Sequence, residues 1–119
     1  MKILTFDACR EKMYVTLSED GIVSESRIIK NTKDKYNSAF LIPTIIELLK
    51  SKKMEVKDID TLGVNIGPGS FTGVRAALTV AKVLQQQLNI KALGIPSLEI
   101  YSLLNKTCKP TLCLLDAKR

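Results

Sequence analysis

Three short β-rich runs follow one another at the start of this chain, and this order limits the possible folds more than any other feature. The runs cover residues 3–7, 13–18 and 22–29, and the turn Glu19-Asp20-Gly21 joins the last two. Short β-rich runs separated by glycine-containing turns are typical of consecutive antiparallel strands. The sequence therefore predicts that the fold begins with an antiparallel meander.

Helical and strand-like patterns alternate after the meander. Apolar side chains recur at spacings of three and four over residues 40–52 and 70–88, which predicts two amphipathic helices. Pro43 lies inside the first pattern, so we expect that helix to start or kink near it. Further elements are predicted from shorter patterns: strands at 61–66, 90–95 and 111–116, and a third helix at 97–104.

The complete order, three antiparallel strands followed by βα units, predicts the fold class. It is the order of the ribonuclease H-like lobe of the actin, Hsp70 and sugar-kinase ATPase superfamily, in which the later strands join a mixed α/β sheet in parallel. We expect residues 1–110 to form one N-terminal, actin-like lobe. Residues 111–119 are expected to open a second lobe that is otherwise absent. This lobe occurs with many activities, so the fold alone names none.

Composition limits where in a cell we expect a chain like this one. The longest apolar stretch is shorter than the roughly 20 residues that a bilayer span needs, and residues 2–7 run directly into a strand, so we expect a soluble protein without a membrane partner. The three cysteines show no zinc-ligand spacing, which favours reduced thiols in a cytoplasm. The net charge of +6 from 18 basic and 12 acidic side chains attracts phosphate polymers without defining a site for them.

A glycine-rich segment, GPGSFTG at residues 67–73, joins a predicted strand to a predicted helix. Free amides and the helix dipole at such a turn can hold a phosphate, which makes Asp7, Gly67, Gly69, Thr72 and Gly73 weak cofactor-binding candidates. However, the segment lacks the lysine of a P-loop. Alternatively, the glycines serve a tight turn and bring the helix close to a neighbouring strand or protein. We expect Ser70 or Thr72 to cap the helix.

The sequence offers few residues for a catalytic or metal-binding site. A nuclease of this fold needs several carboxylates for two metal ions, but Asn65 stands where a partner for Asp7 would be useful. Asp7 is expected to cap the turn formed by residues 8–10 rather than to bind metal. The chain has no histidine to activate a serine or cysteine. We therefore predict no catalytic residue, no metal site and no cofactor held with confidence.

The glycine-rich segment also carries a family resemblance. GPGSFTGVR at residues 67–75 resembles the signature of the TsaB family, also called YeaZ, and the agreement extends over essentially the whole chain. Further segments are similar to family patterns: AKVL at 81–84 to "AKGL", GIPSLE at 94–99 to "GVSSLE", LIP at 41–43 to the "LLP" helix, and LDAKR at 115–119 to the "DAR" strand of the second lobe.

Two departures from the family pattern weaken a nucleotide role. Residues 7–9 read Asp-Ala-Cys where the family usually has Asp-Thr-Ser, so two hydroxyl groups are replaced. Residues 37–39 read Asn-Ser-Ala where His-Ser-Glu is common. Both changes favour a scaffold over a catalyst.

The resemblance implies a non-catalytic subunit of the machinery that makes N6-threonylcarbamoyladenosine in tRNA. In the family, a TsaD-type transferase performs the transfer, TsaB binds it, and a TsaE-type ATPase joins them, so ATP belongs to the wider complex and tRNA contact is indirect. A heterodimer with TsaD through helices 40–52 and 70–88 is implied, with homodimers when that partner is absent. The alternative is an ATP-binding enzyme of the sugar-kinase or acetate-kinase-like class.

The helix at residues 40–52 has apolar side chains on more sides than one small sheet can cover. We therefore expect an exposed helical seam that contacts the partner. The candidate interface residues are Leu41, Ile45, Leu48, Val74 and Leu78. For each of them, packing in the core of the lobe is the alternative.

Overall fold

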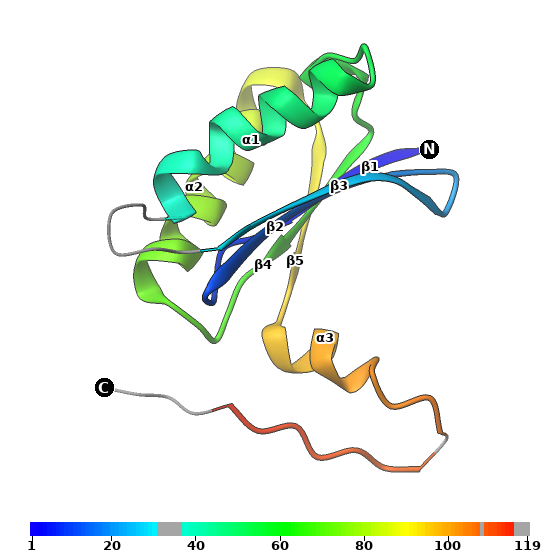
Figure 1. Cartoon of the computed structure of the whole chain (residues 1–119), viewed down its shortest axis with the longest axis vertical. Coiled ribbons are helices and arrows are strands. Elements are labelled where there is room, and N and C mark those ends of the chain that lie inside the picture. The colour runs from blue at the N-terminus through cyan, green and yellow to red at the C-terminus, as the bar shows by residue number, and fades with distance from the viewer. Residues whose placement is uncertain (31–36, 108, 116–119) are drawn as a thin grey trace.

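The computed structural model describes residues 1–30, 37–107 and 109–115. Figure 1 shows a sheet with two long helices on one side and a short third helix at the end of the last strand. The elements are β1 (Lys2–Asp7), β2 (Lys12–Glu19), β3 (Ile22–Lys30), α1 (Asn37–Ser51), a 3-10 turn (Val56–Asp58), β4 (Thr61–Asn65), α2 (Phe71–Leu88), β5 (Lys91–Ile95) and α3 (Ser97–Ser102).

The five strands form one mixed sheet in the order β3-β2-β1-β4-β5. β1, β2 and β3 pair antiparallel, whereas β4 joins β1 and β5 joins β4 in parallel. Asp20 and Gly21 both have positive φ angles, 52° and 82°, at the turn between β2 and β3, as a tight two-residue hairpin requires. The predicted fold class and the predicted meander are confirmed.

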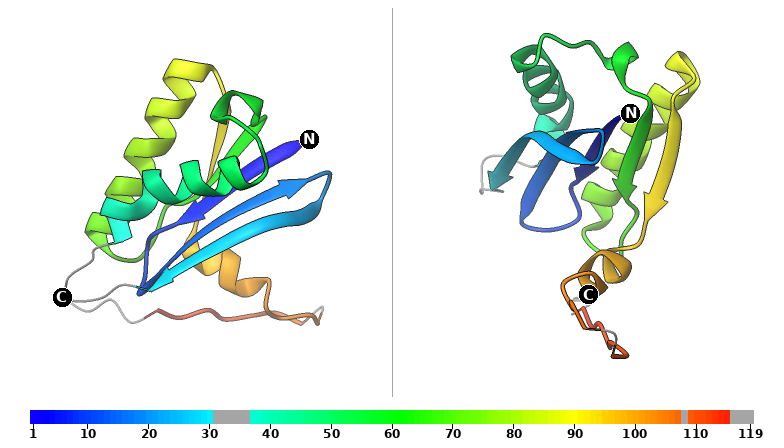
Figure 2. Two further views of the ribbon diagram at one scale, coloured as in Figure 1. Left: turned by 45° about the horizontal axis from the view of Figure 1, so that its top comes forward. Right: turned by 90° about the vertical axis from the view of Figure 1, so that its right-hand side faces the viewer.

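Both long helices pack on the same face of the sheet. α1 lies against β2 and β3, and α2 lies against β1, β4 and β5, as the two views in Figure 2 show. Side chains alternate along each strand, so one set faces these helices and becomes the core. That set consists of Leu4, Phe6, Met13, Val15, Leu17, Leu62 and Val64, all of them buried.

The orientation of α1 differs from the one expected for a partner seam. Leu41, Ile45 and Leu48 are buried against the sheet, so their assignment to an exposed seam is wrong. The reason is that the five-stranded sheet and α2 together cover a wide stripe of α1. Ile42 and Ile46 lie outside that stripe and are exposed, so α1 does carry more apolar surface than the core covers.

Other details of the helices also differ from expectation or refine it. α1 passes through Pro43 rather than starting there, since it spans Asn37–Ser51. α3 ends at Ser102, two residues before the predicted end. Val74 and Leu78 of α2 are half-buried, and Leu78 packs against the edge of the core.

The strand predicted at residues 111–116 is absent from its described part, residues 111–115, and residue 116 lies outside the described residues. The five-stranded ladder ends at β3 and β5, and residues 111–115 do not join either edge. A β-strand requires a neighbouring strand whose backbone can pair with its own amides and carbonyls. Residues 111–115 have no such neighbour in the sheet, so they are not a strand. Figure 1 shows this segment running back beneath α3.

Within the described residues, every helix is too short or too polar to cross a lipid bilayer.

The burial of α1 predicts unequal effects of two substitutions on stability. Leu48→Ala removes a side chain with no exposed area and should lower the free energy of unfolding by about 2–5 kcal/mol. Ile46→Ala removes a partly exposed side chain of the same helix and should cost less than about 1 kcal/mol. Urea unfolding followed by circular dichroism measures both. Equal losses would contradict the orientation of α1.

Candidate functional site

The polar side chains of greatest interest meet where β1 and β4 end. These strands are parallel and neighbouring, so Asp7 at the end of β1 and Asn65 at the end of β4 lie at the same edge of the sheet. The glycine-rich loop begins directly after Asn65, and Ser97 begins α3 after β5. The topology therefore gathers three connections around one position.

Asp7 is held by the chain itself. Its Oδ1 atom accepts a hydrogen bond of 2.8 Å from the Cys9 amide, which confirms that Asp7 caps the turn after β1. Its Oδ2 atom accepts a bond of 2.8 Å from the Asn65 side-chain nitrogen. Both carboxylate oxygens thus have partners within the fold.

Asn65 is the centre of this arrangement, and the sequence analysis assigned it no role. It is buried, and its Oδ1 atom accepts hydrogen bonds from the Gly67 amide at 2.9 Å and from the Ser97 hydroxyl at 2.8 Å. The Ser97 amide in turn donates to the Gly67 carbonyl at 2.7 Å. A polar residue directly after the apolar run at 62–64 was the available signal for such a role.

The glycines of the loop are required by close packing. A Cβ atom on Gly73 would lie 1.8 Å from the carbonyl oxygen of Ala8, and one on Gly69 would lie 2.6 Å from that of Cys9. Gly67 has a φ angle of +94°, which side chains rarely tolerate. The glycines therefore form a tight turn and let the start of α2 approach the turn that follows β1.

Three amides at this loop already have acceptors within the fold. The Ser70 amide donates to the Cys9 carbonyl at 2.6 Å, and the Gly73 amide donates to the Ser70 hydroxyl, which makes Ser70 the cap of α2. The Gly67 amide is bound to Asn65. Thr72 is exposed in the first turn of α2. Phosphate binding at this turn stays a prediction.

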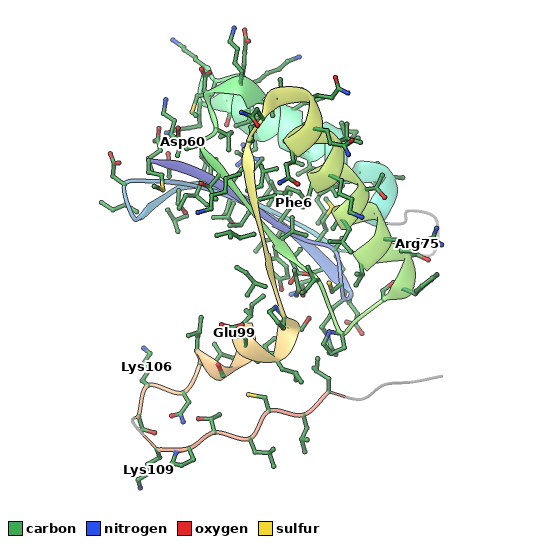
Figure 3. The ribbon with its side chains drawn as sticks, turned by 180° about the vertical axis from the view of Figure 1, so that it is seen from behind. Phe6, Asp60, Arg75, Glu99, Lys106 and Lys109 are labelled. Carbon is green, nitrogen blue, oxygen red and sulfur yellow. The ribbon has the colours of Figure 1, made fainter. Side chains whose placement is uncertain are left out.

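The first two turns of α2 also present an aromatic and a cationic side chain to solvent. The guanidinium of Arg75 lies over the ring of Phe71, 5.1 Å from its centroid. This distance is within the range of a cation–π contact, which is weak at an exposed site. Figure 3 shows Arg75 on the outside of α2, whereas Phe6 lies in the middle of the sheet.

Cys9 is a buried thiol beside Asp7. Burial raises its pKa from the ordinary value of 9.0 to about 12, and the nearby Asp7 carboxylate adds to this shift. Its Sγ atom lies 3.5 Å from the Asn65 carbonyl oxygen, to which it donates. A thiol held in this protonated state is a poor nucleophile.

Carboxylates do not gather around Asp7 in the described part of the chain. There, histidine, cysteine, aspartate and glutamate side chains form no group of three or more with the proximity that a metal ion needs. The neighbour of Asp7 across the strands is the amide of Asn65. Through its hydrogen bonds Asn65 joins β1, β4, the glycine loop and α3, and we call this arrangement the junction.

Substitution of Gly73 tests the packing of the loop. Gly73→Ala places a methyl group into the Ala8 carbonyl and should lower the free energy of unfolding by about 3 kcal/mol or more. Thr72→Ala, at the exposed neighbouring position, should change it by about 0.5 kcal/mol or less. Chemical denaturation of both variants makes the comparison, and a stable Gly73→Ala protein would contradict the close approach.

The raised pKa of Cys9 predicts that its thiol stays unreactive in the folded protein at pH 8. A thiol reagent such as DTNB should label Cys9 only after unfolding, because the folded thiol is buried and protonated. The Cys9→Ser variant should lose one of the three equivalents of labelling in denaturant and none in the native state. The Cys9 thiol has a pKa of 9.0 in the unfolded chain and of about 12 in the folded chain. The free energy of unfolding should therefore fall as the pH rises from 9.0 to about 12, because the unfolded thiol loses its proton first.

Comparison with known proteins agrees with this geometry. The family model described as "TsaD: tRNA N6-adenosine threonylcarbamoyltransferase" matches residues 28–119. The Bacillus subtilis (strain 168) protein named tRNA threonylcarbamoyladenosine biosynthesis protein TsaB is 35% identical over 100 residues, which cover 83% of this chain and 42% of that relative. This chain therefore spans less than half the length of the TsaB relative.

Solved structures give the same picture. YeaZ from Pseudomonas aeruginosa superimposes with a TM-score of 0.77 at 27% identity, covering 85% of this chain and 46% of that one. RuvC of Thermus thermophilus, at 8% identity, covers 86% of this chain and 68% of its own with a TM-score of 0.55, and so shares the fold alone. The chain belongs to the family that the matching model describes, and within it matches the N-terminal portion of the TsaB (YeaZ) proteins.

Proposed function

We propose that this chain is a non-catalytic subunit of the complex that makes N6-threonylcarbamoyladenosine in tRNA. In this role it binds and supports a TsaD-type transferase, with a TsaE-type ATPase joining the pair. The names of its TsaB relatives support the process, since they are described as tRNA threonylcarbamoyladenosine biosynthesis proteins. Such a subunit works in the cytoplasm and meets tRNA through its partners.

The observation that carries the proposal is an exposed apolar ridge on α1. Ile42 and Ile46 stand one helical turn apart and are 54% and 43% exposed. Phe71 and Val83 are further exposed apolar side chains on α2, which packs beside α1. Large apolar side chains at helical spacing on a surface are typical of helix-to-helix docking.

This partner surface, Ile42, Ile46, Phe71 and Val83, replaces the seam expected from the sequence. Leu41, Ile45 and Leu48 lie beneath α1 and are out of reach of a partner. Val74 and Leu78 are half-buried and stay as candidates at the edge of this surface. In the absence of the transferase, the same surface would serve a homodimer.

The lobe boundary also belongs to the proposal. Residues 1–110 act as the first lobe and residues 111–119 lead toward a second one. The path of the backbone supports this division, because residues 111–115 leave the five-stranded sheet and lie beyond α3. The partner surface lies wholly within the first lobe.

The ATP-binding alternative gains less support from the site. A sugar-kinase-like enzyme would use the glycine loop near Asp7 to hold phosphate groups. In this fold the amides of Gly67, Ser70 and Gly73 donate to Asn65, Cys9 and Ser70. These three amides therefore take part in internal bonds that stabilise the junction, which supports a scaffold role.

A charge substitution on α1 tests the proposed partner surface. The double variant Ile42→Glu with Ile46→Glu should weaken binding to a TsaD-type transferase from the same source by at least about tenfold, because two carboxylates would be desolvated at an apolar interface. Ile28→Glu introduces a charge on the opposite face of the sheet and is the control. Size exclusion with light scattering measures complex formation, and circular dichroism checks that each variant is folded.

Two results would contradict this assignment. Undiminished binding by the folded α1 variant would remove the helices from the interface. Failure of the unmodified chain to bind the transferase, with a full-length relative binding in the same assay, would show that the first lobe is insufficient.

A further inference from the structure

An exposed aromatic side chain begins α2. Phe71 is 74% exposed, which is more than any other residue of the partner surface, namely Ile42, Ile46 and Val83. A ring that stands in water contributes little to the core of the lobe. Aromatic side chains are among those that most often dominate the affinity of a protein interface. Phe71 therefore has the largest fraction of its side chain left for a partner to cover.

Arg75 lies over this ring. Its guanidinium carbon is 5.1 Å from the ring centroid of Phe71, and the two residues are one helical turn apart. A cation–π contact uses the charge of the guanidinium and leaves its N–H donors for a hydrogen-bond acceptor. The pair thus presents a restrained cation next to an apolar ring, and both side chains are open to solvent.

The fold supplies no counter-charge for Arg75. Among the described residues, no carboxylate lies within ion-pair distance of its guanidinium. α2 itself contains no aspartate or glutamate in its 18 residues. The acid of α1 is Glu47, whose Oε1 atom lies 3.6 Å from Nε of Arg27 on β3. Arg75 therefore adds an uncompensated positive charge to the partner surface.

The loop before α2 fixes the position of this pair. Ser70, directly before Phe71, caps the helix and donates its amide to the Cys9 carbonyl at 2.6 Å. Two residues after Phe71, Gly73 lies so close to the Ala8 carbonyl that it has no room for a Cβ atom. A binding group on a fixed element loses little conformational entropy when a partner docks.

We propose that Phe71 and Arg75 form a carboxylate-binding anchor, in which the guanidinium binds an aspartate or glutamate side chain of the transferase and the ring packs against the same segment. The inference rests on the proposed function, which supplies the partner, and adds the residue that selects it and the chemical group that is selected. An arginine binds a carboxylate through two parallel N–H···O bonds, which strengthen when docking excludes water.

A phosphate of RNA is the other anion that a guanidinium binds. Nucleic acids ordinarily engage several cations, because every phosphate along the strand carries a charge. The cations of α2 are Arg75 and Lys82, which are seven residues and about 11 Å of helix length apart. An arginine beside an exposed aromatic ring is the composition typical of protein interfaces. These features favour a protein carboxylate over RNA.

Isothermal titration calorimetry with a TsaD-type transferase from the same source tests the anchor. Arg75→Gln keeps a helix-favouring side chain at an exposed position and should weaken binding at least about tenfold. Arg75→Lys keeps the charge without the two-donor fork and should bind at least about threefold more weakly than the unmodified chain. Lys82→Gln removes the other cation of α2 and is the matched control, with an expected change of less than about twofold. Circular dichroism checks that each variant is folded.

Chemical cross-linking identifies the group that the anchor binds. A water-soluble carbodiimide activates a carboxylate, a lysine amine in contact with it then attacks the activated carbon, and an amide forms while the carbodiimide leaves as a urea. At saturating transferase, the Arg75→Lys variant should give a new cross-linked peptide that joins position 75 to an aspartate or glutamate of the transferase. Mass spectrometry detects this peptide, and the unmodified chain should give none at that position.

Four results would overturn the inference. Undiminished transferase binding by the folded Arg75→Gln variant would reject the anchor and leave the proposed function intact. Equal losses in Arg75→Gln and Lys82→Gln would show a diffuse attraction rather than a specific carboxylate contact. If Arg75→Gln weakened binding to tRNA alone, the guanidinium would serve a phosphate. Failure of the unmodified chain to bind the transferase would reject the anchor together with the proposed function.

Discussion

The rest of the structure depends on the buried side-chain amide of Asn65, which links β1, the glycine loop and α3. It donates to Asp7 at the end of β1 and accepts from Gly67 in the loop and from Ser97 at the start of α3. A side-chain amide offers both donors and an acceptor, which a second carboxylate could not do beside Asp7 without repulsion. One neutral residue thus satisfies three connections, and the loop is free to pack against the β1–β2 turn.

The two faces of the sheet have different surroundings. One face is closed by α1 and α2, and the outer surface of α1 still carries the exposed Ile42 and Ile46. The other face has an apolar centre, a groove beside α3 and lysines at its outer strands. A lobe that exposes apolar residues on both sides suits a subunit that is stabilised by its neighbours, because each contact buries surface that the lobe alone leaves in water.

Sequence patterns predicted the strands, the helices and the fold class because alternation and helical spacing report local geometry directly. They predicted the turn at Asp7 for the same reason. They did not identify which stripe of α1 is buried, since Leu41 and Ile42 are both apolar and only the width of the assembled sheet separates them. The role of Asn65 depends on its contacts with Asp7, which is 58 positions away in the sequence, and with Ser97, which is 32 positions away. No local sequence pattern contains such contacts. The strand predicted at residues 111–116 was wrong over its described part, 111–115, for a similar reason, because a strand needs a partner that is distant in the sequence.

The contact between Gly73 and the Ala8 carbonyl also bears on how the GPGSFTG segment is used to infer activity. Steric fit between a loop and a neighbouring turn does not depend on any ligand, so a chain that has lost nucleotide chemistry still needs the same glycines in order to fold. A search with this segment will consequently find proteins that share an architecture. Their reactions have to be assigned from other residues.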